Sequence, residues 1–255
     1  MELSVLGSGS SGNSFFIQNN ENAILVDAGL SAKQITSRLE TIKRSPDMIK
    51  GIFITHEHAD HIRGADVLAR YFNIPIFATK KTIQNSALCS NPDLINSIKN
   101  TEILNLAGME ISAFSKSHQA ADPVSFSITN GKTLSIITDA GFACENIISA
   151  VNQSDFLCLE SNHDEKMLVE GPYPYFLKQW IKSDTGHLSN RQSALCVLEH
   201  ANSKLNHVIL SHLSQTNNTP KLAIKTFNSL IKERSDLKLK TTHSDRNNPT
   251  KLFKI

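Results

Sequence analysis

Cysteine is scarce in this sequence, and the few cysteines present form no recognisable site. The 255 residues contain four, at Cys89, Cys144, Cys158 and Cys196, with no two close together in the chain. This spacing excludes a zinc knuckle and the dense framework of a small disulfide-stabilised protein. Cys158 and Cys196 lie within apolar runs, so we expect buried thiols and a reducing compartment.

Long apolar stretches are also missing. No run approaches the roughly 20 residues that a membrane-spanning helix needs. The first ten residues, MELSVLGSGS, lack the basic stretch followed by an apolar one that is typical of a signal peptide. No internal repeat or low-complexity linker occurs. We therefore expect a cytoplasmic protein with no membrane partner, folded as a single domain over residues 1–255.

The net charge of +2 is too small to indicate a nucleic-acid partner by itself. The charge is unevenly distributed, however, because residues 221–255 contain nine Lys or Arg and three Asp or Glu. Such a segment is able to contact phosphate groups, although a solvated helix and tail is the simpler interpretation.

Short apolar runs and amphipathic stretches follow one another along the whole chain. Their periodicities predict strands at residues 3–6, 14–18, 23–27, 51–55, 74–78, 103–106, 110–114, 124–128, 134–138, 156–160, 207–211 and 251–255. They predict helices at about 31–43, with Ser31 as N-cap, and at 61–72, 79–87, 143–152, 174–182, 190–200 and 220–234. This mixture indicates sheets sandwiched between helices.

The strongest chemical signal is the segment Thr55-His56-Glu57-His58-Ala59-Asp60-His61, between a predicted strand and a predicted helix. Imidazole and carboxylate groups are ligands that zinc, manganese and iron accept. Alternate residues at a strand end point to the same side, so His56 and His58 can face one ion. Asp60 and His61, at the helix start, can face a second. A surface-exposed histidine-rich loop is the less favoured alternative.

Further ligands must come from elsewhere in the chain, because each ion needs four or more. His118, Asp139 and His212 each follow a predicted strand. A residue of this kind is more often a simple polar turn residue. The position shared by all three, just past a buried strand, is nevertheless where α/β sheets carry their active-site groups.

The His-x-His-x-Asp-His motif resembles that of the metallo-β-lactamase superfamily. An early aspartate, Asp27, and the later His118, Asp139 and His212 match the remaining landmarks of that family in order. Further stretches are similar to one branch, the bacterial YycJ/VicX-like (WalJ-type) hydrolases, which are related to tRNA 3′-processing endonucleases. These stretches are residues 6–14, 160–164, 186–190, 211–214 and 217–220.

The resemblance spans nearly the whole chain and implies an α/β protein with the metallo-β-lactamase fold. That fold is a four-layer αβ/βα sandwich of two mixed β-sheets flanked by helices. The resemblance also implies two divalent metal ions, zinc or manganese, or else iron. The implied ligands are His56, His58 and His118 for the first ion, Asp60, His61 and His212 for the second, and Asp139 as the bridge. Asp27 is implied to orient the site.

The resemblance further implies attack by a metal-bridging hydroxide, whose proton Asp60 would accept or orient. His187 is the candidate general acid, because Gly186-His187-Leu188-Ser189 is similar to the Gly-His-Ser loop of the tRNA-processing relatives. This sequence departs from that loop by the insertion of Leu188. The alternative for His187 is a structural residue at a helix N-terminus. His163 is a weaker candidate, since pairing with Asp164 would explain it.

The stretch from Gly7 to Gly12 fits G-x-G-x-x-G, but a dinucleotide site needs a helix after it. Residues 14–17 are predicted to form a strand, so we reject a nucleotide cofactor.

Three functions are consistent with these observations. The first is a phosphodiesterase, and in particular an exonuclease with DNA as the favoured nucleic-acid substrate, as the branch resemblance implies. The alternative is a small-molecule metallohydrolase that acts on a thioester, lactone or lactam. A non-catalytic metal-stabilised protein is disfavoured because every ligand position is filled.

Overall fold

A computed structural model describes residues 1–255 as two compact units. The first contains residues 1–113, 120–130 and 245–255, and the second contains residues 114–119 and 131–244. The expected single domain stays a prediction. The helices are all too short or too polar to cross a membrane.

The strands form two seven-stranded sheets, in the orders β14-β1-β2-β3-β4-β5-β6 and β13-β12-β11-β10-β9-β8-β7. Both sheets are mixed. In the first, β1, β2, β3 and β14 pair antiparallel, whereas β3 to β6 run parallel. In the second, β7 and β8 pair antiparallel, and β10 to β13 run parallel.

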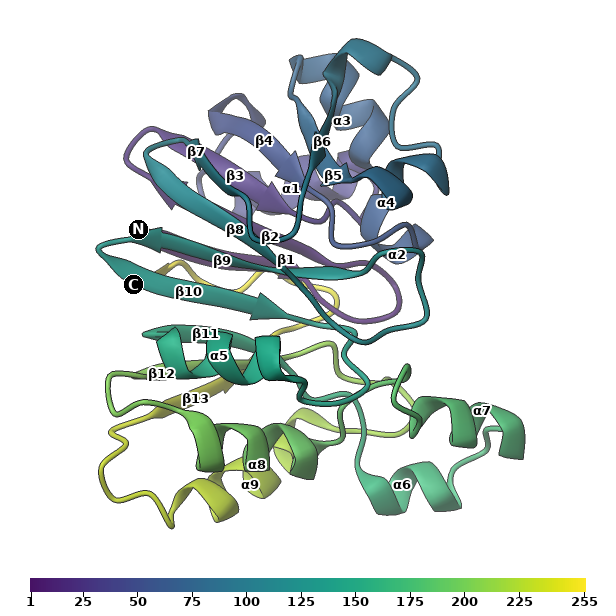
Figure 1. The fold of residues 1–255 in the computed structure, drawn as a ribbon, viewed down its shortest axis with the longest axis vertical. Helices are drawn as coiled ribbons and strands as arrows, with labels where there is room; N and C mark the ends of the chain where they lie inside the picture. The colour runs from purple at the N-terminus through teal and green to yellow at the C-terminus, as the bar shows by residue number, and fades with distance from the viewer. The chain divides into compact units, whose positions relative to one another are not determined.

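The first sheet lies entirely within the first unit (Figure 1). Its strands are β1 (Glu2–Gly7), β2 (Ser14–Asn19), β3 (Asn22–Val26), β4 (Ile49–Phe53), β5 (Ile76–Thr79), β6 (Ile95–Ile98) and β14 (Phe253–Lys254). The helices of this unit are α1 (Ala32–Thr41), α2 (Ala59–Ile62), α3 (Ala65–Phe72) and α4 (Lys80–Gln84). The strands β7 (Ile103–Leu106), β8 (Met109–Ser115) and β9 (Val124–Asn130) follow. The strand β14 pairs with β1 at the sheet edge, as the sequence predicted for residues 251–255.

The core of the first unit forms where α1 and α3 cover the sheet. Ile35 and Leu39 of α1 and Leu68 of α3 are fully buried against strand residues such as Leu25 and Ile52. Each such side chain contributes about 1.5–3 kcal/mol by leaving water. These contacts fix the sheet end from which the histidine motif emerges.

The single helix expected over residues 61–72 is wrong, because the chain breaks between α2 and α3 at Gly64. The Gly64 amide donates to the Ala28 carbonyl at 2.7 Å. A β-carbon at Gly64 would lie 2.3 Å from the Leu30 carbonyl oxygen. Close docking of this turn onto the loop after β3 therefore interrupts the helix.

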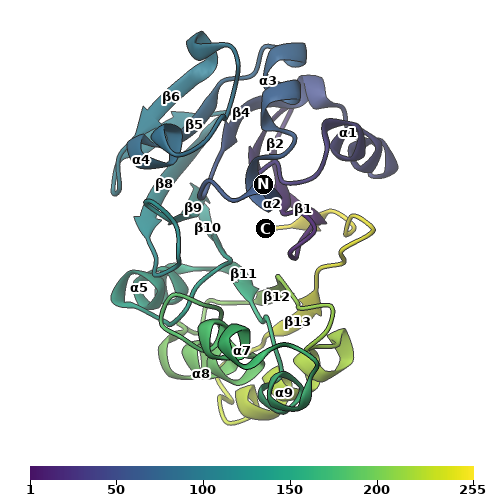
Figure 2. The same ribbon diagram turned by 90° about the vertical axis from the view of Figure 1, so that its right-hand side faces the viewer.

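The second unit is built on the parallel strands β10 (Lys132–Ile137), β11 (Phe156–Glu160), β12 (His207–Ser211) and β13 (Lys240–His243). The helices α5 (Glu145–Gln153), α8 (Asn190–His200) and α9 (Pro220–Ile231) share one hydrophobic core with these strands and lie on one side of them (Figure 2). Two short helices, α6 (Glu165–Glu170) and α7 (Tyr175–Ile181), complete the unit. The register pairs Ile137 with Leu159 and Glu160 with Ser211, so the three strands end at one edge.

Candidate metal centre

Three of the residues singled out by sequence share an unusual backbone conformation. Asp27, Asp139 and His212 have φ values of 59°, 54° and 55°. Each comes one or two residues after a strand, at the end of β3, β10 and β12 respectively. The left-handed region costs a side-chain-bearing residue of order 1–3 kcal/mol, and such residues concentrate at functional sites. The backbone thus turns abruptly where each of these polar side chains is presented.

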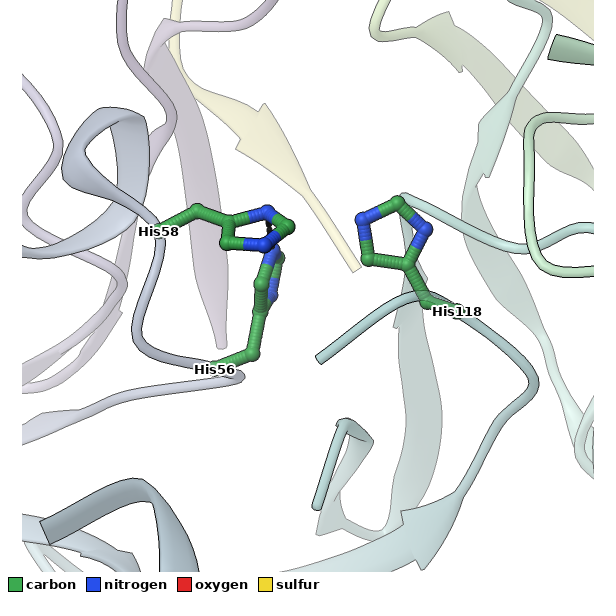
Figure 3. A group of neighbouring side chains, drawn as sticks. All are labelled: His56, His58 and His118. Atoms are coloured by element: carbon green, nitrogen blue, oxygen red, sulfur yellow. Dashed lines mark hydrogen bonds between the residues drawn. The ribbon is translucent and has the colours of Figure 1, made fainter. Parts of the chain in front are cut away.

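In the first unit, the histidine motif brings two imidazole rings together. Nε2 of His56 and Nδ1 of His58 are 3.1 Å apart, and the rings are nearly perpendicular, at 76° (Figure 3). Two nitrogen ligands on one tetrahedral zinc ion, each at 2.0–2.1 Å, lie about 3.3 Å apart. The separation of these two nitrogens therefore fits a shared metal ion.

A buried hydrogen-bond network sets the tautomers of His56 and His61. Thr55 donates to Asp27 through both its amide, at 2.8 Å, and its hydroxyl, at 3.0 Å. His61 Nδ1 lies 2.7 Å from Asp27 Oδ2, and His56 Nδ1 lies 2.9 Å from the Thr55 hydroxyl. These acceptors are satisfied when both rings carry their proton on Nδ1. Each ring then presents the lone pair of Nε2, as a metal ligand must.

Asp60 is positioned by the loop that follows β1. The side-chain amide of Asn13 donates to Asp60 Oδ2 at 3.4 Å and lies 3.2 Å from His61 Nε2. The Asp60 carboxylate is also 3.6 Å from His61 Nε2. A β-carbon at Gly29 would lie 1.6 Å from the Asp60 carbonyl oxygen, so only glycine permits this approach. Asp60 and His61 consequently present donor atoms side by side.

The second unit holds a separate cluster at the common edge of β10, β11 and β12. Asp139, Glu160, His187 and His212 each place a potential ligand atom within 4.8 Å of those of the others. Asp139 Oδ1 is 3.4 Å from His212 Nδ1 and 3.8 Å from His187 Nδ1. All but His187 are almost completely buried. The structure thus brings together Asp139, His187 and His212, which the sequence singled out separately.

Glu160, the last residue of β11, is the centre of this cluster. Its Oε1 accepts hydrogen bonds from Nδ1 of both His187 and His212, each at 2.8 Å. Its Oε2 accepts from the amides of Ala140 and Leu188. Burial raises the pKa of this carboxyl, but the neighbouring His187 and the hydrogen bonds from both rings outweigh it and lower the pKa to about 2. Glu160 therefore stays ionised and directs Nε2 of both rings outward.

His118 follows β8 and belongs to the second unit. Its Nδ1 lies 3.3 Å from the Gly186 carbonyl oxygen, and its Nε2 is 4.0 Å from Asp139 Oδ1. Burial lowers the pKa of His118 to about 3. The ring is therefore neutral near pH 7, which is the form that binds a metal ion.

His187 is held against the only tryptophan of the chain. The rings of Trp180 and His187 meet edge to face, with centroids 5.4 Å apart. The His187 amide donates to the Ile181 carbonyl at 2.9 Å, which ties this loop to the end of α7. A β-carbon at Gly186 would lie 2.3 Å from the carbonyl oxygens of both Trp180 and Ile181. The close turn at Gly186 thus sets the position of His187.

Apart from Asp27, which the resemblance implied, sequence reasoning missed the residues that hold the candidate ligands. It assigned no role to Thr55, Asn13 or Glu160. For Glu160 a signal existed, because a carboxylate ends the otherwise apolar strand β11, where it had to be buried. His163 is buried and outside both clusters, and its Nδ1 has no hydrogen-bond partner. Ser14–Asn19 is a strand, which agrees with the rejection of a dinucleotide site.

Comparison with known proteins identifies the family. Residues 7–87 match the model of the metallo-beta-lactamase superfamily. Over 231 residues the chain is 37% identical to exodeoxyribonuclease WalJ of Streptococcus pneumoniae, covering 88% of this chain and 86% of that protein. It belongs to the metallo-beta-lactamase superfamily. Within this superfamily it is also 33% identical to exodeoxyribonuclease YycJ of Bacillus anthracis, over 92% of this chain and 90% of that protein. The family and branch expected from the motifs are confirmed.

The fold is confirmed by a solved structure of low sequence identity. Zinc-bound PqqB from Methylobacterium extorquens superposes with a TM-score of 0.72 at 15% identity, covering the whole of both chains. The metallo-beta-lactamase fold protein YhfI from Bacillus subtilis also superposes, with a TM-score of 0.73 at 14% identity over 98% of both chains. Together with the two mixed sheets and their flanking helices, this likeness establishes the metallo-beta-lactamase fold. The two clusters of His and carboxylate groups are the candidate metal-binding residues of this member of the superfamily.

Proposed function

We propose that this protein is a metal-dependent phosphodiesterase that degrades DNA from an end. The observation that carries the proposal is the orientation of His56, His61 and His212, whose Nδ1 atoms are engaged by Thr55, Asp27 and Glu160. A set of rings held in this way is suited to ligation through Nε2. The similarity to two proteins named exodeoxyribonucleases, over about nine-tenths of the chain, supports DNA as the substrate.

For the metal ions, we propose the ligand set of the superfamily motif. It assigns His56, His58 and His118 to one ion, Asp60, His61 and His212 to the other, and Asp139 to both. The His and Asp donors suit zinc or manganese, and also iron. The likeness to zinc-bound PqqB supports zinc. Bound ions in such a site lower the pKa of coordinated water and offset charge on phosphoryl oxygens.

Asp60 and His187 are proposed to move protons. The Asp60 carboxylate is partly exposed and held by Asn13, so it can accept or orient the proton of the attacking water. The His187 ring is only partly buried, and its Nδ1 lies 2.8 Å from Glu160 Oε1, which orients the ring. Its Nε2 is then free to protonate the departing sugar oxygen. Trp180, against the same ring, limits its rotation.

End-labelled DNA and RNA, single- and double-stranded, test this function in the presence of Mn²⁺ or Zn²⁺. The expected result is stepwise shortening of DNA, and loss of most of this activity in Asp139→Ala. Turnover of a generic thioester without cleavage of any nucleic acid would establish the small-molecule hydrolase instead.

The His187→Ala variant separates proton transfer from metal binding. It is expected to retain the metal content of the wild type and to lose a factor of about 10²–10⁴ in rate, which is the usual contribution of a general acid. Elemental analysis and single-turnover cleavage measure the two quantities. Unchanged cleavage would remove His187 from the mechanism.

A further inference from the structure

The helix α7 and the turn before it concentrate aromatic side chains in an unusual way. Aromatic residues make up 6% of the chain, yet four occur between positions 173 and 180, namely Tyr173, Tyr175, Phe176 and Trp180. Tyr175 and Phe176 are 76% and 74% exposed. Two large exposed rings at neighbouring positions of one short helix mark a candidate interaction surface. Neither ring is among the proposed metal ligands or proton-transfer groups.

These rings lead directly to the candidate catalytic histidine. Phe176 and Trp180 are four residues apart, so they lie on one face of α7, one turn from each other. Trp180 in turn packs edge to face against His187. A chain that follows this face from Phe176 therefore arrives at His187. The four residues from Phe176 to Trp180 rise about 6 Å along the helix axis.

A lysine side chain, that of Lys182, lies at the C-terminal end of α7. Lys182, the C-cap, lines a pocket of about 400 Å³ together with His163, Ser189 and Gln192. Glu165 also lines the pocket, but it accepts a hydrogen bond from the Ser189 hydroxyl at 3.0 Å. The other lysine of this helix, Lys178, donates to the Val169 carbonyl and so fixes α6 against α7. Lys182 is thus the lysine of α7 placed to meet a phosphate.

We propose that the exposed rings of Tyr175 and Phe176, followed by Lys182, bind the single-stranded end of the DNA substrate and lead it to His187. This inference rests on the proposed function, because it takes DNA as the substrate. Base–aromatic stacking binds single strands without regard to sequence, whereas bases inside a duplex are already stacked on both faces. A lysine adjacent to stacking rings adds a contact to the phosphate backbone.

The test uses the metal-loaded protein and a fluorescein-labelled oligothymidylate with phosphorothioate linkages, which resist cleavage. In fluorescence anisotropy, the Tyr175→Ala/Phe176→Ala double variant is expected to bind about 10- to 100-fold more weakly than the wild type. Tyr71→Ala is the matched control, since Tyr71 is 80% exposed in the first unit. The Tyr175→Phe/Phe176→Tyr variant keeps both rings and should restore binding. Lys182→Gln should lower the salt dependence of binding by about 0.7 in log–log slope.

Cleavage assays distinguish this inference from the proposed function. The double variant should hydrolyse bis(p-nitrophenyl) phosphate at the wild-type rate and degrade single-stranded DNA more slowly. Three results would overturn the inference. The first is an affinity of the double variant for the oligonucleotide equal to that of the wild type, and the second is an equal loss of affinity in Tyr71→Ala. The third is retention of the protein on anionic vesicles from which the oligonucleotide does not displace it. A wild-type protein that binds the oligonucleotide through these rings but cleaves no DNA would refute the proposed function alone. Unchanged degradation of DNA by the double variant would refute the inference alone.

Discussion

Asp27 and Glu160 each hold two other side chains of the candidate site by hydrogen bonds. Asp27 binds Thr55 and His61, and Glu160 binds His187 and His212. Both carboxylates are completely buried. Their role is to fix ring tautomers, and loss of such a partner typically reduces metal affinity by 10- to 100-fold.

The Thr55→Val variant tests this role at its smallest scale. It removes a hydroxyl that lies between Asp27 and His56 while keeping the shape of the side chain. Metal affinity, measured by competition with a chelator, is expected to fall by about 10- to 100-fold. Ser125→Ala is the control, because the buried Ser125 hydroxyl has no hydrogen-bond partner. Equal losses in both variants would contradict a specific role for Thr55.

His163 makes the stability of the protein depend on pH. Burial lowers the pKa of His163 to about 4, below the value near 6.5 of an unfolded chain. Between these values the unfolded chain binds a proton that the folded protein does not. The free energy of unfolding should therefore fall as pH drops from about 6.5 to about 4, by at most about 3 kcal/mol. Urea unfolding at several pH values should show a shallower dependence in His163→Asn than in the wild type.

The sequence was sufficient to predict the candidate ligands and the supporting Asp27, but not the other residues that hold the ligands. His56, His58, Asp60 and His61 fall in one short motif, and spacing alone made them conspicuous. Thr55 and Asn13 have no such pattern, because their roles depend on contacts between segments distant in sequence, such as Asn13 with Asp60.

Helices and strands were predicted best where apolar runs end sharply. The bounds of β11, β12 and α8 are those expected from the sequence. The strands β6 and β13 and the helix α6 were missed. The four residues of β13, Lys-Thr-Thr-His, carry no apolar alternation, and the strand forms because it pairs with β12. Tertiary pairing, which periodicity does not reveal, decides such segments.

Two helices begin with the same capping box, and they provide a matched pair of variants. Ser31 and Gln34 cap α1, and Ser189 and Gln192 cap α8. Replacing either serine with alanine is expected to lower the free energy of unfolding by about 1 kcal/mol. Only Ser189→Ala should also reduce turnover, because Ser189 lies two residues from His187. Chemical unfolding and cleavage of DNA measure the two effects, and an equal loss of turnover in Ser31→Ala would contradict the assignment.

At the scale of the whole molecule, we expect metal ions to contribute to stability as well as to chemistry. A ligand that binds only the folded state stabilises it by about 2.7 kcal/mol when present at 100 times its dissociation constant. Purified protein should contain close to two divalent ions, and chelation should lower Tm. Thermal unfolding with and without chelator, alongside elemental analysis, provides the measurement. A Tm that chelation leaves unchanged, in protein shown to have lost its metal, would contradict this expectation.

The left-handed backbone at Asp27, Asp139 and His212 places opposite demands on these positions, because the backbone favours glycine and the proposed catalysis favours polar side chains. At these positions glycine, which has no β-carbon, would relieve conformational strain, whereas the proposed metal site uses a carboxylate or an imidazole there. A lineage released from selection for catalysis should therefore accumulate glycine at these three places once the buried groups that bond to the present side chains, such as Thr55, have also changed. Retention of all three polar residues in a relative is accordingly evidence that its chemistry is still under selection.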